Sequence, residues 1–92
     1  MITAQTIVKN ASGLHARPAS DFVGKAKTFQ STVTIRNLDH PAEAAVNAKS
    51  IVRLLSLGIV RNTRVEISAD GPDEQEAVHA LVSLIDSGFG EE

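Results

Sequence analysis

The sequence predicts an α+β fold in which one antiparallel β-sheet is covered by helices on a single face. Short segments with alternating apolar residues and longer segments with apolar residues every three or four positions follow one another in the order β-α-β-β-α-β-α. Strands this short, with three helices to cover them, are most economically joined in one such sheet. The 92 residues suffice for one modest core, so a single domain over residues 1–92 is expected.

The first strand is predicted at residues 2–8 and the first helix at about residues 16–28. In the first segment one face would carry Ile2, Ala4, Thr6 and Val8 and the other Thr3, Gln5 and Ile7, as in a strand with one better-buried face. From Ala19 to Phe29, apolar residues recur at spacings of three and four, which indicates a helix with an apolar stripe. Pro18 suits the first turn of this helix, where its missing N–H would have no intrahelical acceptor. The helix therefore begins beside His15.

The middle of the chain predicts two strands and a short helix. Residues 31–36 are β-branched and alternating, and a further strand is expected at residues 44–47, beyond a loop at residues 37–41. The helix spans residues 50–58, with Ser50 or Lys49 near its cap and Gly58 placed to end it. Its apolar residues surround most of its circumference, so it is either deeply buried or offers part of its surface to a partner. They are Ile51, Val52, Leu54, Leu55 and Leu57.

The last strand and helix carry the clearest patterns. Residues 63–69 alternate strictly, with Val65, Ile67 and Ala69 expected to point inward. The final helix begins after Asp70 and Gly71, carries carboxylates in its first turn and ends at Gly88.

Composition excludes several classes of function. With 42% hydrophobic residues, 22% charged residues and a net charge of −2, the chain resembles a soluble globular protein without general attraction for nucleic acid or anionic lipid. Three phenylalanines are the only aromatic residues and no basic cluster occurs, which disfavours nucleic-acid binding. The absence of cysteine excludes disulfides, thiolate zinc sites and cysteine nucleophiles. No segment has the pattern of a leader or a membrane span, so we expect a cytoplasmic protein without membrane insertion.

The stretch GLHARPAS, residues 13–20, is the strongest candidate site. His15 precedes a helix start, where free backbone N–H groups and the positive end of the helix dipole favour an anion. Arg17 adds a fork-shaped cation, and a largely neutral imidazole has a ring nitrogen with a free lone pair that can act as a nucleophile. Such an imidazole could accept and hold a phosphoryl group. A histidine that merely caps the helix or fills a turn is an equally good interpretation of these features.

The other candidate chemistries are weaker. His40 and His79 are interpreted as solvated surface residues, and no histidine pair has metal-ligand spacing, so neither a metal nor a cofactor is expected. A hydrolase would need a base, an orienting acid and an oxyanion pocket, yet Ser12, Ser20 and Asp21 do not have the spacing of a triad. An isolated nucleophile at an open helix end suits a carrier better than a self-sufficient enzyme.

Ser50 has a structural and a regulatory interpretation. A serine at a helix start is first of all an N-cap. If it were phosphorylated, about two negative charges would lie beside an apolar surface available to a partner, and the modification would act as a brake.

Two motifs resemble one known family. GLHARPAS resembles the active-site motif of the HPr family, the histidine-containing phosphocarriers of the bacterial phosphoenolpyruvate:sugar phosphotransferase system, and KSIVRLLSLG, residues 49–58, resembles its regulatory-serine motif. The likeness extends over nearly the whole chain. Two local departures are a segment between Asn37 and Val46 that is longer than the usual tight hairpin, and Asn62 where a glycine is common. Asparagine tolerates a left-handed turn, so the second departure is mild.

The resemblance implies an open-faced β-sandwich with sheet order 1-4-2-3 and three helices on one side. It implies that His15 is phosphorylated on Nδ1 by Enzyme I, which uses phosphoenolpyruvate, and passes the group to IIA domains of sugar permeases. The phosphate would be held at Ala16 and Arg17. Other histidine-carrier branches, linked to nitrogen or dihydroxyacetone, share this chemistry, and a non-catalytic regulatory binding module is a further alternative, although His15 argues against it.

The resemblance also implies how partners bind. Ser50 would be phosphorylated by an HPr kinase/phosphorylase, and the modified chain would bind a catabolite-control transcription regulator. The chain would be a monomeric carrier rather than an enzyme. Its docking surface would comprise Ser20, Lys27, Ile51, Val52, Arg53 and Leu55.

Overall fold

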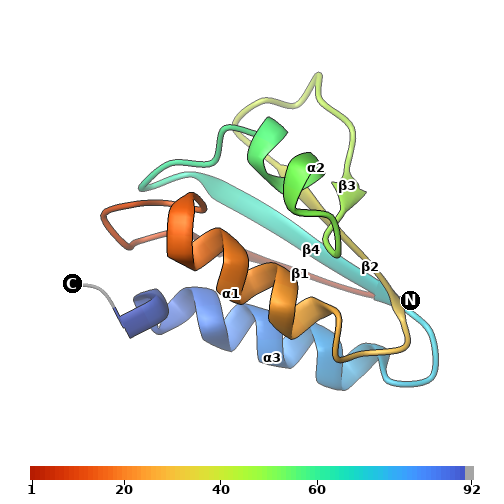
Figure 1. Cartoon of the computed structure of the whole chain (residues 1–92). Coiled ribbons are helices and arrows are strands. Elements are labelled where there is room, and N and C mark those ends of the chain that lie inside the picture. Colours follow the sequence, from red (N-terminus) through yellow and green to blue (C-terminus); the bar gives the residue numbers. More distant parts are fainter. Residues whose placement is uncertain (91–92) are drawn as a thin grey trace.

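The computed structural model describes residues 1–90 and has the expected α+β architecture (Figure 1). Every predicted strand and helix is present within two residues of its expected bounds, and a 3₁₀ turn follows the last helix. The elements are β1 (Ile2–Ile7), α1 (Ala16–Ala26), β2 (Thr32–Asn37), β3 (Val46–Asn47), α2 (Ile51–Ser56), β4 (Arg64–Asp70), α3 (Glu74–Asp86) and η1 (Gly88–Gly90).

The four strands form one antiparallel sheet in the order β1-β4-β2-β3, as expected. Figure 1 shows the helices on one side of this sheet. The other face is open and polar: the hydroxyls of Thr3 and Ser68 are 3.0 Å apart, and Gln5 Nε2 donates to Glu66 over 3.2 Å. The architecture is therefore an open-faced sandwich. Within residues 1–90, no helix has the length and apolar character needed to cross a membrane.

The core lies between the sheet and the helices. The inward residues of β2 and β4 alternate with exposed or half-buried ones, and α1 and α3 contribute their apolar stripes. Each large side chain that is fully buried contributes roughly 1.5–3 kcal/mol relative to an exposed one. The largest from these four elements are Phe22, Val33, Ile35, Val65, Ile67, Leu81 and Ile85.

The segment between β2 and β3 forms a long hairpin loop, so β3 has only two residues, Val46 and Asn47, instead of the expected four. Arg36 Nη2 donates to the Pro41 carbonyl over 3.1 Å, which holds the loop beside β2. The loop is also tied to β4, because the backbone N–H and Nε of Arg64 donate to the Asp39 carboxylate and lower its pKa. Pairing with β2 consequently begins only at Val46.

Candidate phosphate site at the start of α1

His15 occupies the N-cap position of α1, with an extended backbone at φ −129° and ψ 164°. Its imidazole is half-buried and makes no capping hydrogen bond. One interpretation of the sequence was that His15 caps the helix, and the structure shows no such capping bond. A ring nitrogen that is not engaged in capping can act as a nucleophile toward an incoming group.

The backbone after His15 turns sharply. Ala16 has φ +51°, a left-handed conformation that is uncommon for a residue with a Cβ. The first backbone hydrogen bond at this end of α1 joins the Ala19 N–H to the His15 carbonyl over 3.5 Å. The N–H groups of Ala16 and Arg17 precede this bond and have no intrahelical acceptor, while Pro18 has no N–H. No acidic residue lies in the first turn, so these two donors favour an anion.

The loop before His15 is fixed by close packing. Gly13 has φ +64°, and a Cβ placed there would lie 2.6 Å from the Ile59 carbonyl oxygen and 2.7 Å from the Val60 Cα. The fully buried Leu14 donates its N–H to the Ile59 carbonyl over 3.1 Å, and Asn10 Nδ2 donates to the Gly13 carbonyl over 2.9 Å. His15 therefore projects from a backbone held against the segment that follows α2.

Arg17 lies at the surface, with 90% of its side chain exposed. Its Nε lies 3.9 Å from the carboxylate of Asp21, one turn along α1. Arg17 is thus next to the helix start, as predicted, but the structure pairs it with a carboxylate that the sequence reasoning had considered only as a triad candidate.

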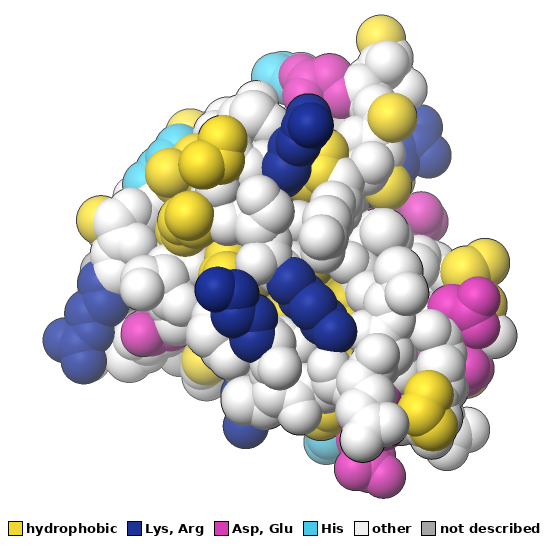
Figure 2. All heavy atoms as spheres, turned by 45° about the vertical axis from the view of Figure 1, so that its right-hand side comes forward, with side chains coloured by type: hydrophobic (Ala, Val, Ile, Leu, Met, Phe, Trp, Pro, Cys, Tyr) yellow, Lys and Arg dark blue, Asp and Glu magenta, His cyan; other side chains and the backbone are white. Residues whose placement is uncertain are grey.

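Helix α2 offers part of its surface to solvent, which decides between the two interpretations of its sequence. Leu54 and Leu57 are buried. The other three apolar residues of the segment are exposed, and so is Val60, whose backbone lies against Gly13. Figure 2 shows hydrophobic side chains gathered over α2. We call this surface the apolar patch, and its residues, with their exposed fractions, are Ile51 (39%), Val52 (73%), Leu55 (42%) and Val60 (55%).

Ser50 is the N-cap of α2, as its structural interpretation predicts. Its side chain accepts a hydrogen bond from the Arg53 N–H over 3.3 Å, and the residue is half-buried. The neighbouring Lys49 extends to the end of α1, where its Nζ donates to the Phe29 carbonyl over 2.7 Å. Ser50 thus lies where α2 begins and immediately precedes the apolar patch.

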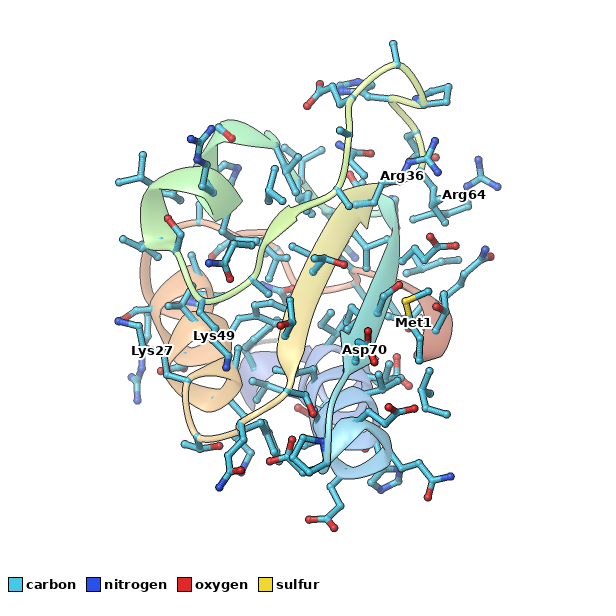
Figure 3. All side chains as sticks on the ribbon, turned by 90° about the vertical axis from the view of Figure 1, so that its right-hand side faces the viewer. Met1, Lys27, Arg36, Lys49, Arg64 and Asp70 are labelled. Atoms are coloured by element: carbon cyan, nitrogen blue, oxygen red, sulfur yellow. The ribbon has the colours of Figure 1, made fainter. Side chains whose placement is uncertain are left out.

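The remaining predicted docking residues are all exposed. Ser20 lies on α1, Lys27 is the C-cap of α1, and Arg53 lies on α2. Figure 3 shows Lys27 and Lys49 on the side of the molecule formed by α1 and α2, away from Arg36 and Arg64. The structure thus places cations on the side of the molecule that carries the apolar patch.

The other histidines lie outside this site. His40, in the long loop, is exposed, and its Nδ1 is 3.2 Å from Glu43, while His79 is exposed on α3. Within residues 1–90, no group of three or more metal-ligating side chains is positioned to hold an ion. A hollow of about 520 Å³ lies at β1, lined by residues that include Ile7, Lys9 and Arg64, but by none of the stretch 13–20. His15 thus lies outside this hollow, at the start of α1.

Sequence reasoning missed three residues of this region. Gly13 was seen only as part of the motif, although its packing positions the loop. Val60 lies outside any helical or strand period, so nothing in the pattern marked it as exposed. The spacing of four between Arg17 and Asp21 is the signal by which their pairing could have been anticipated.

Comparisons with known proteins agree on one family. Residues 2–87 match the family model PTS-HPr, described as the PTS HPr component phosphorylation site. The chain is 42% identical over 89 residues to the multiphosphoryl transfer protein of Vibrio cholerae, covering 97% of this chain and 22% of that protein. It is also 42% identical to the phosphocarrier protein NPr of Proteus mirabilis, covering 92% of this chain and 91% of that protein. The crystal structure of HPr-C-His from Thermoanaerobacter tengcongensis superposes with a TM-score of 0.92 at 46% identity, covering 100% and 99% of the two chains.

Proposed function

Because this chain belongs to the HPr family of phosphocarriers of the phosphotransferase system, we propose that it carries a phosphoryl group on His15. The group would arrive from phosphorylated Enzyme I and leave to IIA domains of sugar permeases. The main support is the geometry at the start of α1, where an imidazole without a capping bond adjoins two N–H groups without intrahelical acceptors. The proposed carrier is one monomeric domain over residues 1–92 that acts in the cytoplasm and is not an enzyme on its own.

The transfer step needs only one nitrogen lone pair on this chain. Nδ1 of the neutral His15 ring attacks the phosphorus atom, a nitrogen–phosphorus bond forms, and the bond between phosphorus and the donor breaks with its electron pair leaving on the donor. The other ring nitrogen keeps its hydrogen throughout. The N–H groups of Ala16 and Arg17 and the Arg17 guanidinium then stabilise the phosphoryl oxygens. Transfer to the acceptor is the same step in reverse, with the acceptor as nucleophile.

The partners would dock on the apolar patch and the cations beside it. Ile51, Val52 and Leu55 supply apolar contact area, and Lys27 and Arg53 provide positive charge for acidic partners. Ser20 is exposed on the first turns of α1 and extends this surface next to His15.

Ser50 would serve as the regulatory position. A phosphate placed there by an HPr kinase/phosphorylase would replace a neutral cap with about two negative charges next to the apolar patch. Binding of Enzyme I would weaken, and a catabolite-control transcription regulator could recognise the modified surface. Ser50→Asp is accordingly expected to slow transfer from Enzyme I, and unchanged kinetics would contradict the brake.

A second candidate is a carrier of a nitrogen-linked branch. Its support is the 42% identity to the Proteus mirabilis phosphocarrier protein NPr over nearly the full length of both chains, which equals the 42% identity to the phosphocarrier protein HPr of Vibrio cholerae. The chain spans about a fifth of the multiphosphoryl transfer proteins that it matches, so a place within a longer protein of that kind is also compatible with the resemblance. A dihydroxyacetone-linked branch would use the same chemistry, whereas a purely regulatory module would not need His15.

The proposal is tested by incubation with phosphoenolpyruvate and a heterologous Enzyme I. Intact mass and phosphorus NMR should show one acid-labile phosphoryl group on the wild-type chain and none on His15→Ala, with the fold unchanged by circular dichroism. His79→Ala, which alters an exposed histidine on α3, is the matched control and should be labelled like the wild type. Label that persists in His15→Ala would overturn the assignment.

A further inference from the structure

The pair formed by Arg17 and Asp21 has a role in neither packing nor capping. Both side chains are solvent-exposed, at 90% and 45%, and they approach each other to 3.9 Å across one helical turn. Exposed pairs of this type contribute little to stability. However, Arg17 is also the cation nearest in sequence to His15. Its pairing with Asp21 in the unphosphorylated chain therefore affects how readily Arg17 binds a phosphoryl group on His15.

We infer that Asp21 is a positioning residue that competes with the phosphoryl group for Arg17. This competition shifts the transfer equilibrium toward the unphosphorylated chain and so favours release of the group to an acceptor. The inference rests on the proposed function and adds to it a residue that sets the transfer equilibrium. No bond is made or broken by Asp21, which acts only through the charge of its carboxylate.

The helix geometry gives the competition a definite sign. Residues four apart lie on the same face, and side chains on a helix lean toward its N-terminus, so the Asp21 carboxylate lies over the turn that begins at Arg17. A guanidinium that binds a phosphoryl group on His15 while its Nε lies 3.9 Å from Asp21 shares its positive charge between two anions. The carboxylate and the phosphoryl oxygens also repel each other. Both effects make the phosphorylated state less favourable than it would be with an uncharged residue at position 21.

The expected magnitude follows from the exposure of the pair. An exposed pair four residues apart on a helix changes an equilibrium by about twofold. A carrier must accept a group from one protein and release it to another, so neither state should be strongly favoured. A twofold change in the phosphorylation equilibrium therefore alters how readily the chain accepts the group relative to how readily it releases it.

The test measures the equilibrium between the phosphorylated and unphosphorylated chain. Catalytic amounts of Enzyme I are incubated with fixed concentrations of phosphoenolpyruvate and pyruvate until the ratio is constant, and the two forms are quantified by intact mass. Asp21→Asn should raise the ratio of phosphorylated to unphosphorylated chain about twofold. Glu76→Gln, which removes one exposed carboxylate on α3, is the matched control for net charge and should leave the ratio unchanged.

A double-mutant cycle separates action through Arg17 from direct repulsion. In an Arg17→Ala chain, Asp21→Asn should shift the ratio clearly less than in the wild type, because the competition no longer exists. An endpoint ratio is insensitive to any slower approach to equilibrium in that chain. No shift, a shift toward the unphosphorylated form, or the same shift in both backgrounds would each overturn the inference. If the wild-type chain accepts no phosphoryl group at all, the proposed function itself fails.

Discussion

Replacement of Gly13 by alanine tests whether close packing of the loop positions His15. The added Cβ would lie 2.6 Å from the Ile59 carbonyl oxygen and 2.7 Å from the Val60 Cα, and both are backbone atoms that cannot rotate away. The loop must therefore move away from residues 59–60. Such a movement would lengthen the hydrogen bond from the Leu14 N–H to Ile59, which is 3.1 Å in the structure.

Two costs add in this variant. The left-handed φ of +64° costs a residue with a Cβ about 1–2 kcal/mol. Overpacking against the backbone costs typically about 1–3 kcal/mol. Together they amount to about 2–5 kcal/mol, a large part of the roughly 5–15 kcal/mol by which a domain is usually stable. For a chain of this size, each kcal/mol lowers the melting temperature by about 4–8 °C.

Urea unfolding followed by circular dichroism measures the effect directly. Gly24→Ala is the matched control, because Gly24 is exposed within α1 and a Cβ there would have no neighbour within 4 Å. That substitution should stabilise the chain by about 0.5–1 kcal/mol, since alanine is the better helix former. If Gly13→Ala unfolds at the same urea concentration as the wild type, the loop is not held by this contact and the reasoning is refuted.

The remaining predictions concern acid stability, the start of α2 and the apolar patch. The Ser31 hydroxyl and the Gln30 N–H donate to the Asp73 carboxylate and lower its pKa below the ordinary 3.8, so the unfolded chain binds the proton more readily. The free energy of unfolding should thus fall as the pH drops below about 3.8, and it should fall less steeply in Asp73→Asn. Urea unfolding at several pH values measures this, and an equal dependence on pH in the two chains would contradict it. Ser50→Ala removes the cap of α2 and should lower the free energy of unfolding by about 1 kcal/mol, whereas an unchanged urea midpoint would mean that the cap contributes nothing. Val52→Ser alters an exposed side chain and should change stability by less than about 0.5 kcal/mol while slowing transfer from Enzyme I, and an unaltered rate would remove Val52 from the docking surface.

The order of elements could be predicted because it depends on local patterns. The alternation in residues 63–69 and the stripe from Ala19 to Phe29 each specify one buried face, and the structure buries those faces, apart from the half-buried Phe29. Asn62 adopts φ +72°, as its tolerance of left-handed turns suggested. The sheet order came from the family resemblance and is also correct.

Features that depend on contacts between distant segments could not be predicted. The exposed side of α2 is set by what packs beneath Leu54 and Leu57, which the residues of the helix do not reveal. The left-handed Ala16 carries no turn signature in the sequence, since alanine is a good helix former. The short β3 follows from the ties of the hairpin loop to Arg36 and Arg64.

The size of the apolar patch also bears on how long each partner would stay bound to the proposed carrier. Four exposed aliphatic side chains are few beside the roughly 20–30 residues that each partner contributes to a typical stable complex, which favours brief encounters over long-lived ones. With His15 as the single acceptor, as proposed, donor and acceptor must both approach the start of α1 and cannot be engaged together. Under the proposed function they compete for the same surface, so a surplus of either would delay the other, and flux would be highest when the two are balanced.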